Sequence, residues 1–100
     1  MNNLRKLARD QQCCVRVPGV CNFDNRTTVL AHLPGAGTGR KAADIFGAHC
    51  CSSCHDVIDG RVKSWYTHNE LKLMHHEGVQ RTQQWLLDNG CLTYEGQEVM

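Results

Sequence analysis

The chain has 100 residues, of which 41% are hydrophobic, and its formal net charge at pH 7 is +1. This length predicts one domain over residues 1–100 and excludes a two-domain protein, because a domain usually spans about 100 to 200 residues. The hydrophobic set includes seven cysteines but only two phenylalanines and two tryptophans. Its core is therefore small and needs stabilisation by a metal, by disulfides or by a partner.

The charges are distributed unevenly along the chain. Residues 1–41 contain seven Lys and Arg against two Asp, whereas residues 88–100 contain three acids and no base. A basic amino-terminal part is compatible with contacts to phosphate. No apolar run reaches the roughly seven residues of a signal peptide or the roughly 20 of a membrane span. We therefore expect a cytoplasmic protein with no membrane partner.

The first half of the chain predicts a short helix followed by strands. Residues 2–9 place Leu4 and Leu7 at helical spacing, with Asn3 as the cap. Residues 13–33 alternate apolar residues with turn formers. That pattern predicts two short strands joined by a loop.

The second half predicts a loop and two helices. Residues 34–47 hold four glycines and a proline, which predicts an exposed loop. One helix begins near Ser52 or Ser53, and the last has Asn69 as its N-cap and Gly90 just past its end. The large apolar side chains expected in the core here are Trp65, Trp85 and Leu86.

The cysteines carry the strongest signal. Cys51-Ser-Ser-Cys54 enters a helix and has Cys13 and Cys21 upstream. Disulfides are rare in a reducing compartment, and two such pairs of thiolates make a tetrahedral zinc site. The upstream pair is more widely spaced than usual, and Cys14 is a rival for Cys13. The alternative is a set of small buried hydrophobic residues, namely Cys13, Cys14, Cys21, Cys50 and Cys91.

Three further side chains could form a second metal site. His55 and Asp59 are four residues apart, so both face one side of a helix, where an imidazole and a carboxylate can share a divalent cation. His32 ends an apolar run before the glycine-rich loop and could supply a third group. Taken singly, each of these residues has a simpler structural explanation. His32 could be a strand-end histidine bonded to a carbonyl, and His55 and Asp59 could be an ordinary pair on the helix surface.

Two other motifs are set aside. Cys51-x-x-Cys54-His55 matches the attachment site of c-type haem, but haem attachment follows export and no signal peptide is present. The stretch around Arg40 is not a P-loop, because that arginine separates glycine from lysine and Ala42 lacks the required hydroxyl.

Together these motifs resemble the zinc-stapled HNH nucleases, with Cys-x7-Cys, a strand ending in Ala31-His32, a loop, and Cys51-x-x-Cys54-His55. They are more closely similar to the YbcO family of prophage nucleases. This resemblance covers most of residues 1–90 and is patchy in 34–50 and 60–75. A looser similarity is to the phage recombination-enhancement nuclease Ref, which acts with RecA filaments. The residues that carry the closer similarity are Asn3 to Arg9, Arg16-x-Pro18-Gly19-x-Cys21 and Cys54-His55-Asp56-x-Ile58-Asp59.

The resemblance implies an α+β fold of the ββα-metal (HNH, His-Me finger) class, flanked by an N-terminal and a C-terminal helix. It makes His32 the general base, and His55 and Asp59 the ligands of a catalytic Mg²⁺ or Mn²⁺ beside the structural zinc. A neutral imidazole can take a proton from water, and the ion can stabilise the charge on phosphate. The basic residues expected to hold DNA are Arg40, Lys41, Arg61 and Lys63, each with a plain solvated-surface role as the alternative.

Two departures from the HNH pattern matter. Many HNH proteins have an acidic metal ligand just before the base, and here that place is Ala31. The asparagine in the middle of the HNH pattern has no clear counterpart in this sequence, although Asp44 or His49 lies in the right region and could orient the loop. Metal binding could therefore depend on substrate phosphate.

The sequence thus predicts a metal-dependent DNA endonuclease from a phage or prophage recombination setting, with a RecA-type recombinase as a candidate partner. The alternative is a non-catalytic, zinc-stapled nucleic-acid-binding module. In that module His32 and His55 only support the part of the chain that binds zinc.

Overall fold

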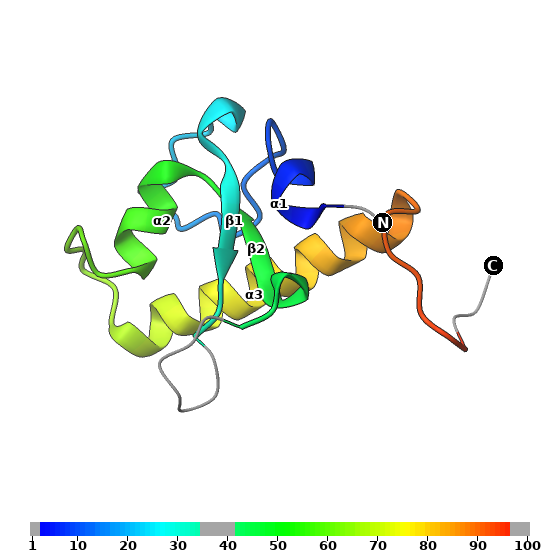
Figure 1. Cartoon of the computed structure of the whole chain (residues 1–100). Helices are drawn as coiled ribbons and strands as arrows, with labels where there is room; N and C mark the ends of the chain where they lie inside the picture. The colour runs from blue at the N-terminus through cyan, green and yellow to red at the C-terminus, as the bar shows by residue number, and fades with distance from the viewer. Residues whose placement is uncertain (1–2, 35–41, 97–100) are drawn as a thin grey trace.

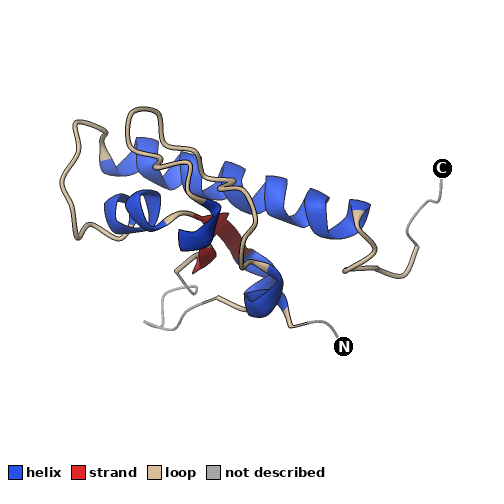
Figure 2. Ribbon diagram, turned by 90° about the horizontal axis from the view of Figure 1, so that it is seen from above, coloured by secondary structure: helices blue, strands red, loops and turns tan. Residues whose placement is uncertain are grey.

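A computed structural model describes residues 3–34 and 42–96 as a small α+β domain built on one long helix (Figure 1). Two short strands lie across this helix, with two shorter helices on opposite sides of the strands (Figures 1 and 2). The elements in chain order are α1 (Leu4–Leu7), β1 (Val29–His32), β2 (Gly47–Cys50), α2 (Ser52–Ile58) and α3 (His68–Asp88), with 3-10 turns η1 (Asn25–Thr27) and η2 (Asp44–Phe46).

The helix starts are set by local hydrogen bonds. The Asn3 side chain accepts from the backbone N–H groups of Arg5 and Lys6, so the predicted cap of the first helix is confirmed. Helix α2 begins at Ser52, as expected. Helix α3 begins earlier than the Asn69 cap predicted. Thr67 and Glu70 form a reciprocal capping box there, which satisfies two backbone N–H groups at once.

The two strands form an antiparallel pair in which Val29 faces Cys50 and His32 faces Gly47. The prediction of two strands within 13–33 was wrong, because β1 is the only strand there and its partner follows the loop. Residues 13–21 instead form turns that lie over the core. All four residues of β2 are buried, so this strand lacks the alternation by which half-buried strands are recognised.

The core is lined by small side chains. It joins buried cysteines and alanines to Val15, Val17 and Val79, the last on α3. Of the three large residues expected in the core, Leu86 is buried and Trp85 is partly buried, but Trp65 is 81% exposed. Trp65 lies in the connection between α2 and α3, where its ring stands beside Tyr66 but stays largely in solvent.

Gly78 lies where α3 packs closely against the amino-terminal loop. A Cβ atom at this position would lie 2.8 Å from Val15 Cγ2 and 3.0 Å from Val15 Cα. We expect Gly78→Ala to lower the free energy of unfolding by about 1 to 3 kcal/mol, because overpacking outweighs the helix propensity of alanine. Urea denaturation with the exposed Gln80→Ala as control would measure this. A more stable Gly78→Ala protein would contradict the close packing.

Candidate functional site

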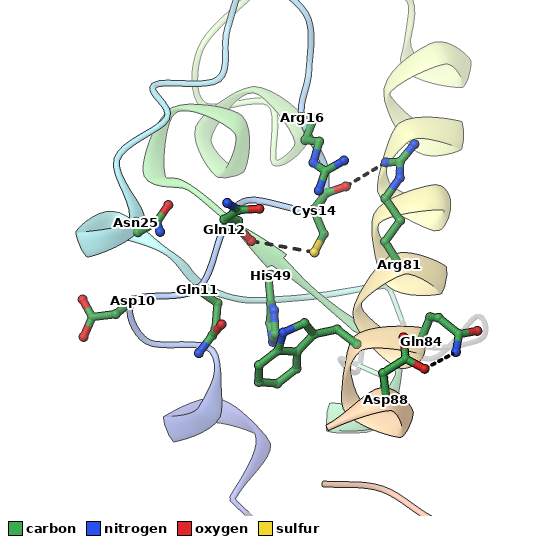
Figure 3. Close-up of a pocket in the computed structure, with 11 residues that line it drawn as sticks. Asp10, Gln11, Gln12, Cys14, Arg16, Asn25, His49, Arg81, Gln84 and Asp88 are labelled. Atoms are coloured by element: carbon green, nitrogen blue, oxygen red, sulfur yellow. Dashed lines mark hydrogen bonds between the residues drawn. The ribbon is translucent and has the colours of Figure 1, made fainter. Parts of the chain in front are cut away.

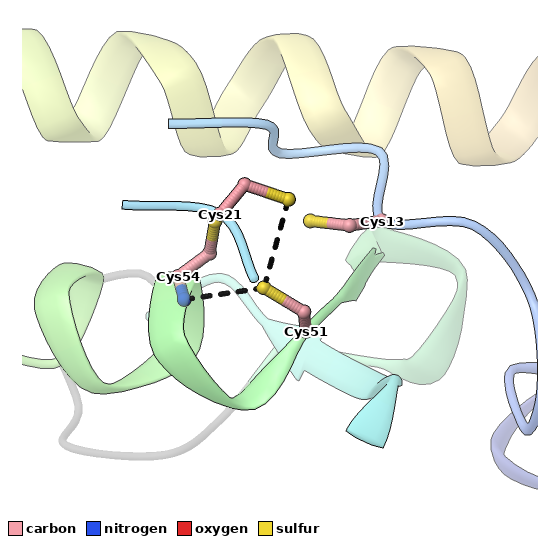
Figure 4. Close-up of side chains that lie close together, drawn as sticks. All are labelled: Cys13, Cys21, Cys51 and Cys54. Carbon is pink, nitrogen blue, oxygen red and sulfur yellow. Dashed lines mark hydrogen bonds between the residues drawn. The ribbon is translucent and has the colours of Figure 1, made fainter. Parts of the chain in front are cut away.

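Four cysteines from two separate parts of the chain meet beside the sheet (Figure 4). The sulfurs of Cys13, Cys21, Cys51 and Cys54 all lie within 4.8 Å of one another. The first two come from the loop before β1. Cys51 is the N-cap of α2, and Cys54 lies in the first turn of that helix.

This arrangement passes the geometric test for zinc. Tetrahedral zinc with Zn–S bonds of about 2.3 Å requires sulfurs about 3.8 Å apart, and the sulfurs of Cys21 and Cys51 are 3.8 Å apart. Backbone N–H groups also point at the sulfurs, from Arg16 to Cys13 and from Cys54 to Cys51, each at 3.4 Å. The four cysteines could therefore hold a metal ion such as zinc.

The structure also separates Cys13 from its rival Cys14. Cys13 joins the cluster, whereas the thiol of Cys14 lies 3.7 Å from the carbonyl of Gln12. Burial raises the pKa of the Cys21 thiol to about 11, and hydrogen bonds from Cys50 and Cys54 lower the pKa of Cys13. Four thiols in such proximity cannot all ionise together unless a cation compensates their charge.

His32 is held by a carboxylate from across the loop. Its Nε2 lies 2.6 Å from Oδ1 of Asp44, and its side chain is only 8% exposed. Asp44 also accepts from Arg5 Nε at 3.2 Å. The hydrogen bond with His32, supported by Arg5, lowers the pKa of Asp44, so this carboxylate is ionised at neutral pH. Because an ionised carboxylate only accepts, Nε2–H donates to Asp44, and Nδ1 is the ring nitrogen that Asp44 leaves free.

His55 and Asp59 form the expected pair on α2. His55 Nε2 lies 3.0 Å from Asp59 Oδ2. Arg61 contacts the same carboxylate at 2.9 Å and Asp56 at 3.3 Å, and it lies 3.5 Å from His55 Nδ1.

In the part of the chain that the structure describes, the four cysteines are the only group of three or more metal-binding side chains in mutual reach. His55 and Asp59 are thus a pair, and His32 does not join them in such a group. A divalent ion at this pair needs further ligands from water or from substrate phosphate.

His75 is a structural residue to which the sequence assigned no chemistry. It is 7% exposed, and its Nε2 lies 2.8 Å from the carbonyl oxygen of Ala31, the residue before His32. Because a carbonyl only accepts, Nε2 carries the proton. Burial lowers the pKa of His75, so the ring is neutral. This bond across 44 residues ties the end of β1 to α3.

The basic residues expected at DNA divide into three cases. Arg40 and Lys41 lie outside the described residues. Arg61 is paired with two carboxylates. Lys63 is exposed and lines a groove that also contains Val62 and Trp65. Within residues 3–34 and 42–96, no helix is long and apolar enough to cross a membrane.

Comparison with known proteins shows the family to which the chain belongs. The profile of the family described as "Putative nuclease YbcO" matches residues 2–91. The chain is 46% identical over 98 residues to "Putative nuclease YbcO" of Escherichia coli (strain K12) and to the protein of that description from Enterobacteria phage 82. Each alignment covers 92% of this chain and 98% of the relative.

A solved structure has a similar fold. It is described as "Structure of a putative bacteriophage protein from Escherichia coli str. K-12 substr. MG1655" and superimposes with a TM-score of 0.76 at 41% sequence identity. The match covers 88% of this chain and 100% of that one.

Proposed function

Since the chain belongs to the YbcO family, which is named for a nuclease, we propose that it is a metal-dependent DNA endonuclease of the HNH type. The observation that carries the proposal is the contact between His32 and Asp44 at the end of β1. A buried imidazole held by an ionised carboxylate, with its second nitrogen free, is the arrangement of a general base.

His32 would activate the attacking water. Asp44 fixes the ring orientation and the tautomer, because it accepts from Nε2–H at 2.6 Å. The lone pair on Nδ1 is then directed away from Asp44 and can accept a proton. Asp44 also stabilises the imidazolium that results. The bond from His75 to the carbonyl of Ala31 keeps the strand end that carries His32 in place.

His55 and Asp59 would hold the catalytic Mg²⁺ or Mn²⁺. Such an ion supplies charge stabilisation at the scissile phosphate. An imidazole and one carboxylate leave positions open for phosphate oxygens and water. Arg61 lies beside both ligands, so its guanidinium is placed to contact a phosphate bound there.

The four cysteines would hold a structural zinc that fixes this part of the fold. Cys51 ends the connection from β2, and Cys54 directly precedes His55. Zinc would therefore set the start of α2 relative to the loop before β1. It would position the residues of the helix without taking part in hydrolysis.

Cleavage of supercoiled plasmid tests the proposal. We expect the zinc-loaded protein to nick the plasmid with Mg²⁺ or Mn²⁺ and not to nick it without an added divalent ion. His55→Ala should reduce the rate by about 100-fold or more, because the ion loses one of its two protein ligands. The exposed His68→Ala serves as the matched control. Metal-independent cleavage, or cleavage unchanged in His55→Ala, would contradict the assigned metal site.

One observation favours the non-catalytic alternative. Ala31 stands where many HNH proteins have an acidic ligand, so His55 and Asp59 alone form the proposed ion site. A nucleic-acid-binding module would bind DNA without cleaving it in any divalent metal. The assay should therefore also include a RecA filament, since a recombinase partner is part of the proposal. Binding without cleavage under both conditions would favour the module.

A further inference from the structure

A second site lies away from the proposed nuclease residues. A pocket of about 550 Å³ opens between the loop at residues 10–16, strand β2 and the last turns of α3 (Figure 3). Neither His32, His55 nor Asp59 lines it. Its volume lies within the range of roughly 300 to 1,000 Å³ that is typical of small-molecule sites.

His49 lines the pocket from β2 and is only 1% exposed. Its backbone is fully engaged: its N–H donates to Thr82 Oγ1 at 2.9 Å, and its carbonyl accepts from Cys14 N at 2.7 Å. Its ring meets the indole of Trp85 edge-on, with centroids 5.3 Å apart. Neither ring nitrogen has a hydrogen-bond partner among the described residues.

Among the described residues, Thr28 Oγ1 is the one fully buried side-chain nitrogen or oxygen without a partner. The ring nitrogens of His49, which lines the pocket, are therefore available to a ligand there. A neutral imidazole offers one donor and one acceptor. This combination fits a ligand that presents hydrogen-bonding groups to an apolar wall.

Two arginines supply positive charge at one end of the pocket. Arg16 Nε donates to the carbonyl of Cys13 at 3.0 Å, and Arg81 Nη1 donates to the carbonyl of Cys14 at 2.8 Å. Each guanidinium is thus anchored by one nitrogen while its others stay available. No carboxylate of the described chain lies within 4.0 Å of either. Fixed, uncompensated guanidinium groups are typical of phosphate sites.

The backbone of the pocket loop is strained at two residues that line it. Asp10 has φ of 63° and Arg16 has φ of 52°, in the left-handed region that residues other than glycine rarely adopt. Such strain gathers at binding and catalytic sites. Arg16 is further fixed through its own N–H, which points at the sulfur of Cys13, so the metal centre and the pocket share one loop.

The remaining lining suits a nucleobase. Gln11, Gln12 and Asn25 present amides, which can pair with the edges of a base. Asp10 and Asp88 also line the pocket. The part of the pocket that these carboxylates line is negatively charged, in contrast to the arginine end. A ligand with one anionic group and a polar aromatic body matches this division better than a polyphosphate does.

We propose that this pocket binds one nucleotide, with the phosphate at Arg16 and Arg81 and the base toward His49. In a nuclease, which is the function proposed above, this nucleotide would belong to the bound strand. A free mononucleotide offers the same chemistry, so the test separates the two sources.

The test measures binding by the zinc-loaded full chain in a Trp65→Phe background, where Trp85 is the one remaining indole. The probes are deoxynucleoside 5′-monophosphates, a short single-stranded oligonucleotide and inorganic phosphate. We expect nucleotide binding to change the fluorescence of Trp85 and the ¹⁵N shifts of the His49 ring. Arg16→Gln and Arg81→Gln should each weaken binding about tenfold or more.

The control is Lys72→Gln, which removes one exposed positive charge from the same helix and should leave the affinity unchanged. His49→Phe keeps a ring against Trp85 and should weaken binding without affecting zinc content. If the His49→Phe protein fails to fold, the two arginine variants still test whether the pocket binds a nucleotide.

Each outcome is informative. Arginine-dependent binding of monophosphates supports a site for free nucleotides, and arginine-dependent binding of the oligonucleotide alone supports a site for the strand. No binding by the folded, zinc-loaded protein, or phosphate bound as tightly as nucleotide, would overturn the proposal. His32→Ala should retain binding, so loss of cleavage and loss of this site are distinguishable.

Discussion

Stripping the metal from the four-cysteine site is expected to abolish the cooperative thermal unfolding transition of this protein. A structural zinc that binds only the folded state stabilises small domains by about 10 to 16 kcal/mol. That is as large as the total stability of a typical domain, about 5 to 15 kcal/mol. The small core of valines, alanines and cysteines offers little to replace it. Circular dichroism melting before and after chelation, with zinc content measured in parallel, checks this.

Cys54→Ser should have the same effect, because serine is a poor zinc ligand and the other three sulfurs are left with an incomplete site. The matched control is Cys91→Ser, since Cys91 lies outside the cluster, beyond the end of α3. We expect one zinc per chain and a normal melting transition for this control. An unchanged transition after proven loss of zinc would show that the cysteines do not stabilise the fold through a metal.

His32→Ala should reduce DNA cleavage by about 100- to 10,000-fold, the usual contribution of a general base. Asp44 remains ionised at neutral pH in wild type, because its pKa is lowered by His32 and Arg5. Asp44→Asn should therefore also reduce cleavage, since the amide does not fix the reactive tautomer. Plasmid cleavage at saturating Mg²⁺ or Mn²⁺ measures both effects.

The control for His32 is His76→Ala, because His76 is exposed and its ring bonds to the carbonyl of Lys72 on its own helix. Zinc content should stay at one per chain in all three variants, which separates a chemical defect from an unfolded protein. Cleavage at the wild-type rate in a folded His32→Ala protein would remove His32 from the mechanism and would require a different general base.

The parts of the site that could be predicted are those whose partners are close in sequence. Cys51 and Cys54 are three residues apart at a helix start, and His55 and Asp59 are one helical turn apart, so helix geometry alone places each pair. The bond of His32 to Asp44 spans 12 residues and that of His75 to Ala31 spans 44. No local pattern encodes such contacts. Strand β2 was missed for a related reason, since burial of its whole length removed the alternation.

The sequence by itself indicated that the cysteines form a candidate metal site rather than disulfides, that a helix carries His55 and Asp59 on one face, and that the chain resembles the YbcO family. These conclusions rest on residue type and spacing, which act over one or two turns of chain. Only the tertiary structure decided that Cys13 rather than Cys14 joins the cluster, that Asp44 holds His32, and that His49 and two arginines share a pocket. Each of these depends on how loop, strand and long helix pack together, because contacts between distant segments follow from the whole fold.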